Sequence, residues 1–238
     1  MIPTQRSDDI SDLILFLDKI LGYDSKHERR GAHPNDVQKL VGLITYKLPD
    51  IYIGYLYNFG LQDSVLKMAG DAETTLNELI EFYEQQALCG NQDIPHNGVV
   101  IATEGLSGGR ALIYSESKDV EPIVVVNWSQ DIGEICAQSF RNHLYHQAFI
   151  RGRLRAEFRQ VAYGTDQSFF ARIGSFALQV GFQSYWFSDD CQLCLERDDD
   201  VVINVRRTKD MIIAYIQARI EKECVDLKAS LARELGMK

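Results

Sequence analysis

The chain has 238 residues, of which 45% are hydrophobic and 25% charged, so it can bury a core and is not a disordered segment. Its net charge of −9 disfavours binding to nucleic acid or to an anionic membrane surface, although an acidic balance also serves simply to keep a protein soluble. No apolar run approaches the ~20 residues that cross a bilayer, and the first residues carry acids where a signal peptide would be basic. Together with five cysteines in no framework spacing, these features predict a cytoplasmic protein.

Helical periodicity governs the first part of the chain. Apolar residues recur at helical spacing over residues 10–21, where Gly22 ends the helix, and in segments that begin near Asp36 and near Ile51. The polar stretch between the first two helices is predicted to be a loop or short linker. A fourth helix is expected over about residues 73–88.

The middle of the chain favours strands. Short β-branched runs predict three of them, over residues 98–104, 110–115 and 122–128. Asp131 and Glu134 then have the spacing of a capping box, which predicts a helix over residues 132–149.

Beyond residue 150 we expect a basic helical connector followed by a three-stranded meander and one covering helix. Residues 176–182 alternate between apolar and polar or small side chains, which is typical of a strand. Two further strands are predicted over about residues 191–196 and 201–206. Thr208 is expected to cap a long final helix that Gly236 closes.

One short motif raises the question of catalysis. Residues 105–109, Gly-Leu-Ser-Gly-Gly, match the G-x-S-x-G pattern of a nucleophile elbow, which must join a strand to a helix. Here a second β-branched run follows, so the glycines are better explained by a hairpin. We therefore predict that Ser107 is not a nucleophile, and a serine hydrolase that uses Ser107 is the alternative.

No metal or cofactor site is predicted. Cys191-x-x-Cys194 lacks the second ligand pair that a structural zinc needs, and Asp198–Asp200 suits an acidic turn as well as a cation. His143 and His146 have no carboxylate that can be assigned as their partner, so we expect ordinary, partly exposed histidines. The prediction is therefore no catalytic residue, no cofactor and no metal.

Four segments carry a likeness to a known family. They are "LPDIYIGYLYNFG", "VVIATEGLSGGRALIY", "EPIVVVNWSQ" and "EICAQSFRNHL". They resemble, respectively, the Leu-Pro helix, the Gly-rich hairpin, the following strand and the closing helix of the SUKH superfamily, the Smi/Knr-like domain. The residues that carry the likeness are Leu48, Pro49, Tyr52, Leu56, Asn58, Gly60, Ala102, Glu104, Gly105, Gly108 or Gly109, Ala137, Ser139 and Phe140.

The resemblance covers about residues 36–150 and implies an α+β fold. In that fold helices flank a central, mostly antiparallel sheet, to which we add the C-terminal β-meander and long helix. The predicted organisation is an N-terminal helix and linker (1–35), a SUKH-like domain (36–150) and a C-terminal βββα extension (151–238).

The resemblance also implies a function. Many bacterial SUKH domains are immunity proteins that bind and neutralise a cognate toxin, often one that acts on nucleic acid, and related eukaryotic domains are regulatory adaptors. We therefore expect a non-catalytic module that binds a basic toxin domain and neither nucleic acid nor membrane, with a regulatory adaptor as the alternative. Residues 31–150 contain 15 acids against 6 bases, which suits such a partner. The candidate partner-binding residues are Glu78, Glu81, Glu84, Glu104, Glu116, Asp119 and Glu121. No oligomeric state is predicted.

Overall fold

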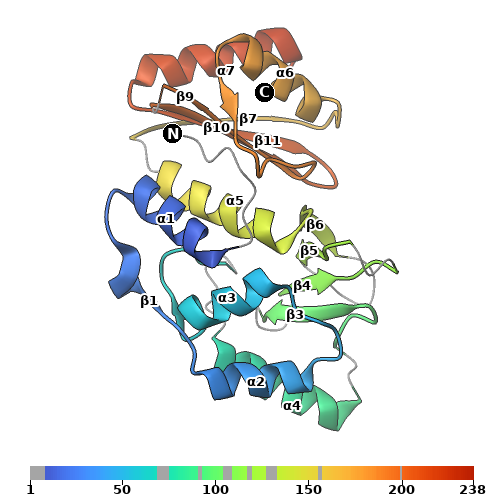
Figure 1. The fold of residues 1–238 in the computed structure, drawn as a ribbon. Helices are drawn as coiled ribbons and strands as arrows, with labels where there is room; N and C mark the ends of the chain where they lie inside the picture. Colours follow the sequence, from blue (N-terminus) through green and yellow to red (C-terminus); the bar gives the residue numbers. More distant parts are fainter. Residues whose placement is uncertain are drawn as a thin grey trace. The chain divides into compact units, whose positions relative to one another are not determined.

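The computed structural model describes residues 9–68, 75–90, 93–103, 109–116, 120–126, 133–154, 157–198 and 200–238 (Figure 1). These residues form α-helices and antiparallel sheets, which confirms the predicted α+β class. They divide into two compact units that meet in the sequence between Ala148 and Phe149, here called the N-terminal and C-terminal units. None of the helices in the described ranges is both long and apolar enough to cross a membrane.

The described part of the N-terminal unit contains four complete α-helices and the first part of a fifth. They are α1 (Ile10–Leu21), α2 (Pro34–Leu43), α3 (Asp50–Phe59), α4 (Leu76–Cys89) and the first part of α5 (Phe140–Arg153). The first four confirm the predicted helices. Local signals explain α1, because the Asp9 carboxylate accepts a hydrogen bond from the Ser11 amide at 2.8 Å and Gly22 ends the helix at a φ of +79°.

The segment predicted as a linker is more ordered than expected. It contains a 3₁₀ turn, η1 (Ser25–Glu28), and a short strand, β1 (Arg29–Arg30). This strand pairs with β2 (Gln62–Asp63), which follows α3 in the sequence. The pairing joins positions more than thirty residues apart, so no local sequence signal could indicate it.

A four-stranded antiparallel sheet completes the N-terminal unit. Its strands, adjacent in chain order, are β3 (Gly98–Ala102), β4 (Arg110–Ile113), β5 (Ile123–Val126) and β6 (Glu134–Ala137). The first three were predicted. The helix predicted over 132–149 was wrong at its start, because residues 134–137 pair with β5 and α5 begins only at Phe140. The helix-capping side chain is Ser139, whose hydroxyl accepts a hydrogen bond from the Asn142 amide at 3.1 Å.

The Tyr83 hydroxyl forms hydrogen bonds with backbone groups at one edge of this sheet. β3 is an edge strand, and an edge strand leaves backbone groups without a strand partner. The buried Tyr83 hydroxyl of α4 donates to the Val100 carbonyl at 3.1 Å and accepts from the Val100 amide at 2.7 Å. Burial raises the pKa of Tyr83 above its usual range, so the hydroxyl keeps the proton that it donates.

Replacing Tyr83 with phenylalanine is therefore expected to destabilise the protein by about 1–3 kcal/mol, because two buried backbone groups lose their partner. Chemical denaturation of the full chain measures the change. Tyr57→Phe is the control, because the Tyr57 side chain is exposed. Equal stability changes in the two variants would contradict this role of Tyr83.

The C-terminal unit contains a five-stranded antiparallel sheet. Its strands, in spatial order, are β7 (Phe158–Gly164), β11 (Ile212–Ala218), β10 (Val201–Arg207), β9 (Gln192–Arg197) and β8 (Gln183–Ser184). Two helices, α6 (Phe169–Gln179) and α7 (Glu221–Leu235), cover one face (Figure 1). The core between this face and the helices includes Ile173, Ile203, Ile216 and Leu231, each fully buried. Two of the three predicted meander strands are present as β9 and β10, and the end of the predicted final helix is α7.

Several predicted boundaries in this unit were wrong. The basic connector is helical only to Arg153, after which β7 begins at Phe158. Residues 169–179 form a helix and not a strand. The alternation was misleading, since Leu178, expected to be buried, is 58% exposed.

The predicted long final helix is divided into a strand and a shorter helix. Residues 212–218 form β11, which lies between β7 and β10 and pairs with both. Thr208 caps no helix. Its hydroxyl accepts a hydrogen bond from the Met211 amide at 3.1 Å in the turn between β10 and β11.

Candidate functional site

The acidic candidates fall into two groups in the N-terminal unit. Helix α4 brings Glu78, Glu81 and Glu84 together at one-turn spacing, with all three side chains exposed. Glu116 and Glu121 belong to the connection between β4 and β5. Glu104 and Asp119 lie outside the described residues.

Three of these carboxylates already have partners. Glu78 closes a capping box and accepts from the Thr75 amide at 2.6 Å, so it holds the start of α4. Glu84 pairs with Lys39 at 2.7 Å, and Glu121 pairs with the buried Arg141 at 2.7 Å. Glu81 and Glu116 are exposed and form no ion pair within the described part of the chain. They are therefore the carboxylates most available to a partner.

The motif at residues 105–109 lies between two antiparallel strands. Ser107 itself is outside the described residues. On either side of it, Ala102 of β3 pairs with Arg110 of β4, so the segment connects the strands of a hairpin. The elbow of a serine hydrolase would instead lead from a strand into a helix.

The two histidines differ from expectation, because both are buried. His143 is 2% exposed and His146 is 1% exposed. The Nε2 atom of His143 lies 2.9 Å from the Met68 carbonyl oxygen, and its Nδ1 atom lies 3.8 Å from the Cys136 thiol. His143 therefore joins three separate segments of the N-terminal unit, a role that residue spacing alone could not indicate.

The Cys191-x-x-Cys194 pair is buried in the C-terminal unit. Burial raises the pKa of the Cys194 thiol well above its usual value, which favours the neutral thiol over the thiolate that binds metals. Across the described residues, no group of three His, Cys, Asp or Glu side chains is arranged to hold a metal ion.

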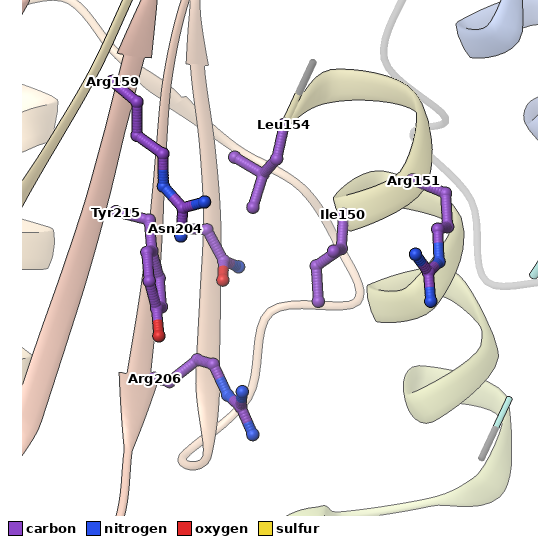
Figure 2. Close-up of a pocket in the computed structure, with 7 residues that line it drawn as sticks. All are labelled: Ile150, Arg151, Leu154, Arg159, Asn204, Arg206 and Tyr215. Atoms are coloured by element: carbon purple, nitrogen blue, oxygen red, sulfur yellow. The ribbon is translucent and has the colours of Figure 1, made fainter. Parts of the chain in front are cut away.

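A pocket of about 320 Å³ lies in the C-terminal unit (Figure 2). Its residues Asn204 and Arg206 alternate along β10 with Ile203 and Val205, which belong to the core with α6 and α7, so the pocket lies on the opposite face of the sheet. We call it the arginine pocket. Three strands form its floor and the end of α5 forms its wall. Its lining residues are Ile150, Arg151, Leu154, Arg159, Asn204, Arg206 and Tyr215.

Strand alternation and register place the polar residues of this pocket. Asn204 and Arg206 are two positions apart on β10, so they share a face, and Tyr215 of β11 pairs with Asn204. The Arg159 guanidinium lies over the Tyr215 ring, 4.9 Å from its centroid. On the helical wall, Ile150 and Leu154 point toward the sheet (Figure 2).

Asn204 is the most buried residue of the arginine pocket, with 0% exposure. Its Nδ2 group donates to the Leu193 carbonyl at 3.3 Å and lies 3.5 Å from the Cys194 sulfur. Its Oδ1 atom is buried and accepts no hydrogen bond from the described residues. A buried acceptor without a donor is uncommon in proteins, so a further hydrogen-bond donor is expected at this atom.

A buried ion pair anchors the wall of the arginine pocket. The Arg153 Nε atom lies 3.0 Å from a carboxylate oxygen of Glu196, a β9 residue that is 4% exposed. The Tyr185 hydroxyl donates to the other carboxylate oxygen. Phe149 packs against Tyr185 with ring centroids 5.3 Å apart, which also holds this end of α5 on the sheet.

The arginine pocket was not predicted from the sequence. The basic segment after residue 150 was interpreted as a connector, and Tyr215 was assigned to the final helix, although Arg206 was correctly placed in a strand. The signal that could have found it is the polar alternation Asn204-x-Arg206 in a β-branched strand, because it places an amide and a guanidinium on the same face.

No protein-family model, no curated protein and no solved structure matches this chain.

Proposed function

We propose that this protein is a non-catalytic binding module whose acidic N-terminal unit binds a basic protein. The observation that carries the proposal is the charge of residues 31–150, where 15 acids stand against 6 bases. Glu81 and Glu116 are the exposed carboxylates expected to contribute most, because neither is held in an ion pair by the described residues.

The resemblance to SUKH domains makes a toxin that acts on nucleic acid the partner we favour. Such a toxin needs a basic surface to hold phosphates. An acidic blocker would be attracted to that surface and would cover it, so that charge complementarity raises the association rate and selects the partner. A regulatory adaptor that binds no toxin is the second candidate, and it shares the same acidic surface.

The experiment measures binding of the purified full chain to the product of the adjacent gene. The test variant is Glu81→Lys/Glu116→Lys, and the control is Asp210→Lys/Asp226→Lys, which makes the same charge change at exposed sites of the C-terminal unit. We expect the test variant to associate at least tenfold more slowly than the control. Both should melt close to wild type, because exposed charges contribute at most about 1 kcal/mol to stability.

Equal association of the two variants would contradict the proposed surface. A toxin gene product that binds and loses its activity would support immunity over the adaptor. Tight binding of the protein to nucleic acid would contradict both the immunity function and the adaptor function.

A further inference from the structure

The arginine pocket has no role in the proposed function, because all of its residues lie in the C-terminal unit. We propose that it binds a small phosphate monoester. Arg159 and Arg206 bind the phosphate, and the Oδ1 atom of Asn204 accepts an N–H or O–H from the organic part of the ligand.

The charge of the lining selects an anion. Of the seven described residues that line it, three are arginines and none is an acid. The nearby Glu196 carboxylate is bound by Arg153 and Tyr185, so it does not neutralise the pocket. A phosphate monoester carries a charge of about −1.5 to −2 at neutral pH and three terminal oxygens, which matches several guanidinium groups better than a carboxylate does.

The geometry of Arg159 suits this role. Its guanidinium carbon lies 4.9 Å from the centroid of the Tyr215 ring, and this cation–π contact holds the positive charge on the sheet face of the pocket. Arg159 forms no ion pair with an acid among the described residues, so its N–H donors can bind an anion. Arg206 lies on the same sheet face, two residues beyond Asn204, and its side chain is exposed.

The orientation of the Asn204 amide follows from its neighbours. The Leu193 carbonyl only accepts hydrogen bonds, so the group facing it must be the Asn204 NH₂. The Oδ1 atom then faces away from that carbonyl, buried and without a donor among the residues that the structure describes. A ligand hydroxyl or amine would satisfy it, which gives the pocket a preference beyond charge.

The size of the pocket indicates an organic ligand and not a bare ion. At about 30 Å³ per water molecule, 320 Å³ corresponds to roughly ten waters. Ile150 and Leu154 also add an apolar wall, which inorganic phosphate would not use (Figure 2). A polynucleotide is the less suitable ligand, because the whole chain carries a net charge of −9.

Calorimetric titration of the full chain tests the ligand chemistry. The probes are ribose 5-phosphate, AMP, methyl phosphate, inorganic phosphate and adenosine. We expect ribose 5-phosphate or AMP to bind, and whichever binds more tightly distinguishes a sugar phosphate from a nucleotide. Methyl phosphate, which has no donor on its organic part, should bind at least tenfold more weakly. Adenosine should not bind.

The residues are tested by Arg159→Gln and Arg206→Gln, both at exposed positions, with Arg233→Gln on α7 as the matched control. Each pocket variant should lose at least tenfold in affinity for the phosphate ester, while the control keeps wild-type affinity. The proposal is overturned if no phosphate ester binds at millimolar concentration, if adenosine or inorganic phosphate binds as tightly as the esters, or if Arg159→Gln and Arg206→Gln both keep wild-type affinity. None of these results depends on the protein partner.

Discussion

Replacing Arg153 with methionine is expected to lower the free energy of unfolding by about 3 kcal/mol. Arg153 pairs with Glu196, whose side chain is 4% exposed, and removing one member of a buried pair leaves the other charge without compensation. The Arg153 side chain is itself 22% exposed, so the loss should fall at the lower end of the range for buried pairs. Denaturation of the full chain measures the stability, and hydrogen exchange of β9 and β10 shows that the C-terminal unit is affected.

The double variant Arg153→Met/Glu196→Gln is the control for this interpretation. It removes both charges and keeps an amide oxygen as the acceptor for the Tyr185 hydroxyl. We expect it to recover more than half of the lost stability, because an ion pair replaced as a whole leaves no uncompensated charge. A loss below about 1 kcal/mol in the single variant would show that the pair is as weak as a surface ion pair.

A second large effect is expected at Gly109, the last residue of the G-x-S-x-G motif. A Cβ atom built on Gly109 would lie 1.7 Å from the carbonyl oxygen of Ala102, so the backbone of the hairpin would have to move. We therefore expect Gly109→Ala to destabilise the protein by about 2–4 kcal/mol. Chemical denaturation, with hydrogen exchange of β3 and β4, measures the change.

Gly42→Ala is the matched control. Gly42 lies in α2, and an added Cβ would meet no atom within 4 Å. This substitution should leave stability unchanged or raise it by up to about 1 kcal/mol, because alanine favours the helix. If Gly109→Ala is as stable as this control, close packing of the hairpin backbone is not the reason that residue 109 is a glycine.

The fold could be predicted where its signals are local. Helix α1 follows from its apolar period and from Gly22, and strands β3 to β5 follow from β-branched runs. Strand β6 and strand β11 were missed because both depend on pairing with other strands, which overrides the helical pattern of the same residues. Sequence periodicity contains no information about those neighbours.

The same limit applies to the sites. The role of Glu78 could have been predicted, since Thr75-x-x-Glu78 is a capping box within four residues. The pairing of Glu121 with Arg141 crosses twenty positions and becomes visible only in the structure. The arginine pocket depends on strand register as well, because Tyr215 meets Asn204 only when β10 and β11 are paired as they are.

The most direct test of the central claim is the rate at which the protein associates with the product of its neighbouring gene across a salt series. If the acidic N-terminal unit steers a basic partner, the association rate should fall at least tenfold from low to moderate ionic strength. The association rate of the Glu81→Lys/Glu116→Lys variant should change less with salt than that of the wild type, and the variant should melt close to the wild-type temperature. An association rate that does not change with salt would contradict the account.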